Sequence, residues 1–292
     1  MRIAGVLAVL GLGTASVACA DGRQEVVTLM SGGQEVVGTL MRPDGAPAPV
    51  VLMLHGFTGA RDELASDHVP AGVFGHTAAK LADAGYASLR IDFRGSGESL
   101  ADLTFADTTF EGQIADGLAA LEYLATSAAV QGEKIYVIGW SQGGLVASAV
   151  AGRSGTPRAV ALWNAVGTPM QTFSDLLGTE AVEAAIAAEA DATLGFTLPW
   201  GAELDLKGAF FDQVATFDPM AEIAAYPGPL LVAQGDKDTA VLPENGPKYI
   251  EAHTGTERLW AADMDHVFNI FGESTTLDAL IGETIAFFDG VH

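Results

Sequence analysis

The feature that most constrains this chain is a serine flanked by glycines, placed where a predicted strand meets a predicted helix. The segment 139–143 reads Gly-Trp-Ser-Gln-Gly, with an apolar run at 134–138 before it and a small, apolar run at 144–150 after it. Glycines two positions before and after Ser141 let the two backbones approach without a Cβ clash, so the serine occupies a strained tip with its hydroxyl exposed. An ordinary turn rich in glycine and serine can have the same Gly-x-Ser-x-Gly pattern. A match at the end of a buried strand, however, indicates a nucleophile elbow.

The composition fits one large α/β domain or two small ones. The chain has 292 residues, 49% of them hydrophobic, which is enough for a sizeable core. Lys and Arg number 14 against 37 Asp and Glu, giving a net charge of -23. So acidic a surface repels phosphate backbones and anionic lipid headgroups, and no nucleic-acid partner is expected. The ordinary explanation of the charge is solubility, and it says nothing about a substrate.

Residues 1–20 are predicted to be an export signal. Arg2 forms a minimal positive region, an apolar core follows, and Ala-Cys-Ala at 18–20 fits a cleavage site. The apolar stretch is too short to span a bilayer, and no other segment approaches transmembrane length. We therefore expect a periplasmic or secreted protein whose domain spans 21–292. Cys19, the only cysteine, leaves a lipid anchor as the alternative, and the domain itself has no thiol or disulfide.

Apolar runs alternate with helical patterns along most of the chain. Two β-rich runs, 24–30 and 35–41, flank Ser-Gly-Gly and predict a hairpin. The other expected strands are 49–54, 87–93, 135–140, 159–164, 230–233 and 258–261, and the expected helices include 74–84, 109–128 and 277–288. Uninterrupted apolar strands separated by helices predict an α/β fold with a mostly parallel central sheet flanked by helices on both faces.

One interval breaks this alternation. More than sixty residues separate the expected strands at 159–164 and 230–233, and a connection that long indicates a lid, here about 166–226. It holds a helical piece at 180–190 and a piece rich in Gly, Pro and aromatic residues at 194–211. The aromatic residues expected to line an acyl pocket are Phe196, Trp200, Phe210 and Phe211. For each of these aromatic residues taken singly, packing of the lid onto the core explains its presence equally well.

A serine nucleophile needs a neighbouring base, and the base needs an orienting carboxylate. On a sheet of this kind the acid and then the histidine follow the serine, in loops at the carboxyl ends of strands. His266 comes shortly after the strand 258–261 and is the expected base. His253 is expected on the surface of a helix. Asp236 and Asp238 both follow the strand 230–233 and compete for the role of the acid.

An oxyanion hole needs two backbone N–H donors. The Gln142 N–H is expected to supply one of them. The Phe57 N–H, in the loop His-Gly-Phe-Thr-Gly at 55–59, is expected to supply the other. His55 is interpreted as a buried residue that organises this loop.

Taken together, these segments resemble the α/β-hydrolases over about residues 25–290. The resemblance rests on His-Gly-Phe at 55–57, Asp-Phe-Arg-Gly-Ser-Gly-Glu-Ser at 92–99, the elbow at 139–143, Gly-Asp-Lys-Asp at 235–238 and Asp-His-Val-Phe at 265–268. It implies that Asp238 is the acid, since the acid of the family lies in G-x-x-D-x-x-V. It also implies that the segment 92–99 is a structural loop. Within the family the chain is most similar to bacterial cinnamoyl and feruloyl esterases and related lidded carboxylesterases.

The function expected from these features is that of a secreted serine carboxylesterase. Ser141, His266 and Asp238 would hydrolyse carboxylic esters through an acyl-enzyme, with a cinnamoyl-type acyl preference implied by the resemblance. The alternatives are a serine peptidase or acyltransferase on the same fold and, least favoured because the triad is complete, a non-catalytic binding module. No metal cluster, phosphate loop or nucleotide motif is present, so no cofactor is expected. The expected partner is a small-molecule ester, and the oligomeric state is left open.

Overall fold

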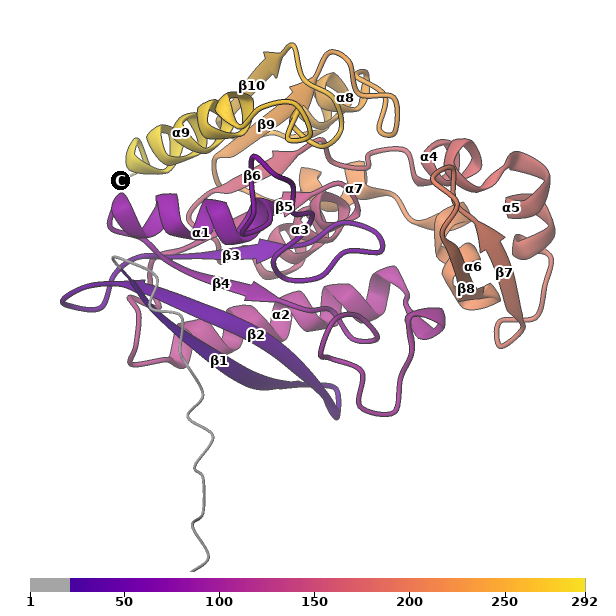
Figure 1. Ribbon diagram of the computed structural model, residues 1–292, viewed down its shortest axis with the longest axis horizontal. Helices are drawn as coiled ribbons and strands as arrows, with labels where there is room; N and C mark the ends of the chain where they lie inside the picture. Colours follow the sequence, from indigo (N-terminus) through magenta and orange to yellow (C-terminus); the bar gives the residue numbers. More distant parts are fainter. Residues whose placement is uncertain (1–21, 292) are drawn as a thin grey trace, which may run out of the picture.

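The computed structural model describes residues 22–291, and the predicted export signal at 1–20 lies outside the described residues. The fold is built on an eight-stranded sheet in the order β1-β2-β4-β3-β5-β6-β9-β10 (Figure 1). Its strands are β1 Gly22–Ser31, β2 Gln34–Pro43, β3 Val50–Leu54, β4 Ala87–Ile91, β5 Ile135–Trp140, β6 Val160–Trp163, β9 Leu230–Gly235 and β10 Glu257–Ala262. No helix within 22–291 is long and apolar enough to cross a membrane.

The sheet is parallel except at one edge. β1 and β2 form the predicted hairpin, and β2 pairs antiparallel with β4. The strands β4, β3, β5, β6, β9 and β10 are parallel to one another. Parallel strands need long crossover connections, and the helices in those connections cover the two faces of the sheet. The predicted α/β architecture is confirmed.

Helices cover both faces of this sheet (Figure 1). The connections contain α1 Val73–Asp83, α2 Phe110–Thr126, α3 Gln142–Ser154 and α8 Asn245–Ala252, and α9 Thr275–Asp289 follows the last strand. β3 shows how the strands serve two cores. Val50, Leu52 and Leu54 pack with α2 and α3 on one face, while Val51 and Met53 pack with α1 and α9 on the other. Because successive strand residues point to opposite faces, a strand buried on both sides has to be apolar throughout, as its sequence is.

The long interval between β6 and β9 forms a cap beside the sheet (Figure 1). We define the cap as residues 169–216, which contain α4 Pro169–Leu177, α5 Thr179–Ile186, β7 Thr193–Thr197, β8 Glu203–Lys207 and α6 Gly208–Thr216. β7 and β8 form a separate two-stranded antiparallel ribbon. The Gly/Pro-rich piece at 194–211 is therefore largely this hairpin, which its irregular composition did not reveal.

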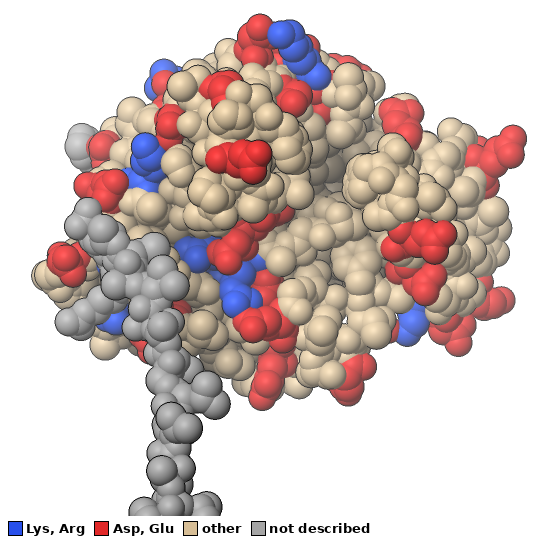
Figure 2. All heavy atoms as spheres, in the orientation of Figure 1, with Lys and Arg blue, Asp and Glu red and all other residues tan. Residues whose placement is uncertain are grey.

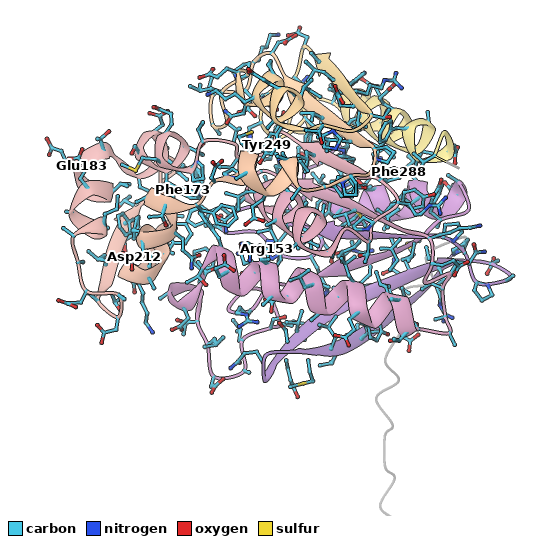
Figure 3. All side chains as sticks on the ribbon, turned by 180° about the vertical axis from the view of Figure 1, so that it is seen from behind. Arg153, Phe173, Glu183, Asp212, Tyr249 and Phe288 are labelled. Carbon is cyan, nitrogen blue, oxygen red and sulfur yellow. The ribbon has the colours of Figure 1, made fainter. Side chains whose placement is uncertain are left out.

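The last helix of the interval, α7 Pro219–Ala224, belongs to the main domain rather than to the cap. It packs so closely on α3 that a Cβ on Gly152 would lie 2.0 Å from the Glu222 carbonyl oxygen. Arg153, on α3, binds Glu222 and the α2 residue Glu111, each at 2.6 Å, and joins three helices (Figure 3). The segment that projects over the sheet edge is consequently shorter than the interval between the strands.

Candidate active site

Ser141 lies at the turn between β5 and α3 and has a φ of 55°, which is unusual for a residue with a side chain. The turn is possible because glycines flank it. A Cβ on Gly139 would lie 2.3 Å from the Gly143 carbonyl oxygen, and one on Gly143 would lie 2.0 Å from the carbonyl oxygen of Leu54. The close contact between β5, α3 and β3 thus places Ser141 at the carboxyl edge of the sheet, on the wall of a cavity.

His266 and Asp238 meet this serine from two neighbouring loops. His266 Nε2 lies 3.0 Å from Ser141 Oγ, and His266 Nδ1 lies 2.7 Å from Asp238 Oδ2. The other oxygen, Asp238 Oδ1, accepts the backbone N–H groups of Ala240 and Val241 at 2.8 Å each. These bonds fix the carboxylate, and the carboxylate fixes the imidazole with Nε2 toward the serine.

The backbone of His266 is also held in place. Its carbonyl oxygen accepts the Trp140 indole N–H and the Asn164 side-chain N–H, both at 3.1 Å. Asn164 follows β6 directly, and its side-chain oxygen accepts the Gly235 N–H at 2.8 Å. One asparagine therefore joins the acid-bearing and histidine-bearing loops, a role that the sequence analysis missed because nothing in its local pattern indicates it.

Two alternatives weighed from the sequence are placed away from this chain of contacts. Asp236 is exposed, whereas Asp238 is buried. His253 is not on the surface as expected. It is buried at the end of α8, and its Nε2 lies 3.0 Å from the Gly228 carbonyl oxygen. Its ring closes a turn in the core and does not face Ser141.

The two residues expected to supply the oxyanion donors line the same cavity as Ser141. Gln142 is the first residue of α3, where a backbone N–H has no acceptor within the helix. Phe57 lies in the loop after β3 and lines the same cavity as Ser141. We call residues 55–59 the oxyanion loop.

His55 holds the oxyanion loop, as the sequence predicts. The ring is buried, and its Nδ1 lies 2.8 Å from the Gly56 carbonyl oxygen, while its Nε2 accepts the Phe93 N–H at 3.1 Å. Burial lowers the pKa of this imidazole, so the ring is neutral and carries its proton on Nδ1.

A cavity of about 1180 Å³ opens over Ser141 and His266, between the main domain and the cap. In Figure 2 the surface between the main domain and the cap is largely uncharged. The apolar side chains on its wall include Phe57, Leu64, Phe105, Phe173, Leu176, Leu198, Trp200, Leu204 and Phe271. Among the described residues, its charged wall groups are Glu63, Glu203 and Asp205, with no lysine or arginine.

The four aromatic residues expected to form an acyl pocket divide into two groups. Trp200, at the tip of the β7–β8 hairpin, lines the cavity and is 64% exposed. Phe196, Phe210 and Phe211 are buried inside the cap and do not line the cavity, which corrects the expectation for these three.

Phe210 shows the physical reason. Its ring packs against Phe57, Phe110, Phe173 and Phe211 at centroid distances of 5.0 to 5.7 Å. Such a small cap needs its own aromatic core and needs to be joined to the main domain, and these rings serve both needs. Phe173, which the sequence analysis missed, reaches the cavity from this junction (Figure 3).

Glu63 is a second residue that the sequence analysis missed. Its Oε1 accepts the N–H of Gly56 in the oxyanion loop, and its side chain is part of the cavity wall. Burial raises the pKa of this carboxyl to about 8, with the Gly56 hydrogen bond opposing the shift. A glutamate in a polar loop carries no sequence signal for such a position.

Comparison with known proteins supports the fold. The chain resembles Est1E from Butyrivibrio proteoclasticus with bound ferulic acid, at 21% identity and a TM-score of 0.70, over 91% of this chain and 98% of the other. An esterase from Pyrococcus furiosus is 19% identical with a TM-score of 0.67, over 92% and 91% of the two chains. The acylaminoacyl peptidase of Pyrococcus horikoshii is 14% identical with a TM-score of 0.67, over 93% of this chain and 42% of that one.

Among curated protein sequences, none matches the chain. The model of the prolyl oligopeptidase family matches residues 73–273, which include the elbow, the acid loop and the histidine loop. The resemblance to the α/β-hydrolases is thereby confirmed. The chain is a hydrolase with the α/β-hydrolase fold and belongs to the prolyl oligopeptidase family.

Proposed function

We propose that this protein is a serine carboxylesterase, with Ser141 as the nucleophile, His266 as the base and Asp238 as the orienting acid. The observation that carries the proposal is the continuous hydrogen-bonded chain from Asp238 through His266 to Ser141 Oγ at the base of a largely apolar cavity. A neutral hydroxyl becomes a useful nucleophile only when an adjacent base takes its proton.

The reaction has two halves. Ser141 Oγ attacks the ester carbonyl while His266 Nε2 takes the hydroxyl proton, and the Phe57 and Gln142 N–H groups bind the oxyanion. The tetrahedral intermediate breaks its bond to the alkoxide, which receives the proton from His266. A water molecule then loses a proton to His266 and attacks the acyl carbonyl carbon. The bond from that carbon to Ser141 Oγ breaks, His266 returns the proton to Oγ, and the carboxylic acid is released.

The proposed substrate is an uncharged ester with an apolar or aromatic acyl group, as in cinnamoyl-type esters. Phe173, Leu198 and Trp200 offer apolar contact surface, and the three wall carboxylates, where ionised, disfavour an anionic substrate. The neighbour Est1E was solved with ferulic acid, an aromatic acid of this kind. Export to the periplasm or medium is proposed from the predicted signal at 1–20.

A peptidase or acyltransferase is the second candidate, favoured by the name of the matching family and by the acylaminoacyl peptidase among the neighbours. The likeness to that peptidase covers 42% of its chain, whereas the likeness to Est1E covers 98% of the esterase. The likeness to the esterase thus extends over nearly the whole of that protein, whereas more than half of the peptidase has no counterpart in the match, and this difference favours the ester hypothesis.

Turnover of a substrate panel tests the proposal. The purified protein is given p-nitrophenyl esters of increasing acyl length, methyl ferulate and an aminoacyl p-nitroanilide, with Ser141→Ala as the blank. We expect ester hydrolysis that the alanine variant lacks, with kcat/KM for the anilide lower by about 100-fold or more. Amide turnover equal to or above ester turnover would establish the peptidase instead.

A further inference from the structure

The side chain of Glu63 fills the inside of the oxyanion loop. Its Oε1 accepts the Gly56 N–H, and a Cβ on Gly59 would lie 2.6 Å from Oε2 and 2.8 Å from Oε1. A side chain at position 59 would therefore force this carboxyl group to move.

The backbone of Glu63 is fixed in a rare conformation. Its φ is 61°, in the left-handed region that costs free energy for a residue with a side chain. The N–H donates to the Ala60 carbonyl oxygen at 2.9 Å, and a Cβ on Gly72 would lie 2.8 Å from the Glu63 carbonyl oxygen. A strained backbone held by close packing aims this side chain at the oxyanion loop.

The hydrogen bonds to Gly56, one of which Glu63 accepts, together set the direction of the proposed oxyanion donor. The Gly56 carbonyl oxygen accepts from the His55 ring at 2.8 Å and from the Gly59 N–H at 3.2 Å. In a planar trans peptide the C=O of Gly56 and the N–H of Phe57 point in opposite directions. Holding Gly56 at both its N–H and its C=O therefore sets where the Phe57 N–H points.

Glu63 and the nucleophile also lie on the same side of Gly56. A Cβ on Gly56 would lie 3.3 Å from Ser141 Cβ and 3.5 Å from Glu63 Oε1. A negative charge on Glu63 would consequently face the region where the tetrahedral intermediate develops its own negative charge. An uncharged carboxylic acid would keep the loop in place without that repulsion.

We propose that Glu63 is a positioning residue for the oxyanion hole, which supports the reaction as a neutral acid and weakens it when ionised. This inference rests on the proposed serine hydrolase reaction. Burial, which raises the pKa of the carboxyl to about 8, is consistent with a neutral side chain at pH 7.

No cation is placed to keep Glu63 ionised among the described groups around it. Arg61 binds Asp92 and Glu98, and the pKa of the Glu63 carboxyl responds to burial and to the Gly56 hydrogen bond. The remaining titratable groups on the cavity wall are His266, Glu203 and Asp205.

The test compares Glu63→Gln, Glu63→Ala and Asp67→Asn with the wild-type protein. Glutamine keeps an oxygen for the Gly56 N–H but cannot ionise, alanine removes the contact, and Asp67 is an exposed control on the same loop. For each variant, kcat and KM for p-nitrophenyl acetate and the rate of fluorophosphonate labelling are measured between about pH 6 and pH 10.

We expect wild-type kcat and labelling to fall about tenfold as the pH rises through 8, and this alkaline fall to be absent in Glu63→Gln. Glu63→Ala should lose about 10- to 100-fold in kcat with KM changed by less than about threefold, since the oxyanion forms only in the transition state. Asp67→Asn should retain the wild-type profile.

An alkaline fall that persists in Glu63→Gln, or a wild type with no such fall, would overturn the proposal. If Glu63→Ala does not fold, the pH profile of Glu63→Gln decides. Failure of the esterase hypothesis is recognised separately, as absence of ester turnover while fluorophosphonate still labels Ser141. The pH dependence of that labelling then still tests Glu63.

Discussion

The carboxylate of Asp238 divides its two oxygens between its own loop and His266. Oδ1 accepts two backbone N–H groups of the turn at 2.8 Å, and Oδ2 lies 2.7 Å from His266 Nδ1. The acid thus has its position set by the loop after β9, while the histidine comes from the loop after β10. Ser141, after β5, completes the chain because parallel strands bring their carboxyl ends to one edge.

Ser141→Ala should reduce esterase activity to nearly the uncatalysed rate, because it removes the proposed nucleophile. In the wild type a fluorophosphonate probe should label Ser141 alone. Mass spectrometry of the labelled peptide checks this. Labelling of a different serine, or an active alanine variant, would refute the assignment.

Asp238→Asn should lower kcat by about 10⁴-fold, because an amide at this position favours the wrong tautomer of His266. Asp236→Asn is the matched control two residues away. Asp236 is exposed, so its kcat should stay within about threefold of the wild type. A larger loss from Asp236→Asn at equal thermal stability would mean that the acid is misassigned.

Trp200→Ala should change the ratio of kcat/KM for aryl and short aliphatic esters by about tenfold, since this ring lines the cavity and is otherwise exposed. Phe210→Ala is the contrasting variant. It removes a buried ring from the cap and should cost about 3–5 kcal/mol of stability with little direct effect on selectivity. Kinetics and thermal unfolding of both variants distinguish the two roles. Equal selectivity in Trp200→Ala and wild type would remove this side chain from the binding site.

Gly143→Ala should prevent the elbow from forming, because the new Cβ would lie 2.0 Å from the Leu54 carbonyl oxygen. We expect a large loss of soluble protein or of Tm. Gly282→Ala, on α9, is the control. Its Cβ would meet nothing within 4 Å, and alanine should stabilise the helix by up to about 1 kcal/mol. A Gly143→Ala protein with wild-type Tm would contradict the close approach of α3 and β3.

Glu63→Gln should raise stability most above neutral pH. Since the pKa of Glu63 is raised to about 8 in the folded protein, the unfolded chain releases this proton at a lower pH than the folded one does. The protonated carboxyl therefore makes its full contribution to the free energy of unfolding below the pKa of Glu63 in the unfolded chain, roughly 4. That contribution is lost as the pH rises through 8. The Tm advantage of the glutamine variant should grow by on the order of a few degrees between about pH 5 and pH 8. An advantage that does not change with pH would contradict the raised pKa.

Much of the fold is predictable because it depends on local patterns. The apolar runs at 135–140 and 230–233 correspond to β5 Ile135–Trp140 and β9 Leu230–Gly235, and the hairpin at 24–41 is present as β1 and β2. A strand buried on both faces must be apolar along its length, so its sequence marks it directly. The flanking glycines mark Ser141 for a similar reason, since the close approach of two backbones excludes other residues.

The remaining features depend on which distant segments meet. Asp236 and Asp238 share one loop and one residue type, and only the direction of the turn decides which carboxylate reaches His266. The aromatic residues of the cap have similar sequence surroundings, yet Trp200 lies at the cavity and Phe210 in the interior.

The sequence by itself therefore determined the alternation of strands and helices in the main domain, the elbow and the type of chemistry, because each is encoded by the spacing of residues along the chain. The tertiary structure alone decided the insertion of Glu63 into the oxyanion loop and the contacts through which Asn164 joins the acid and histidine loops. Contacts between separate loops depend on how those loops pack against each other, and the local pattern around each residue carries no record of that packing.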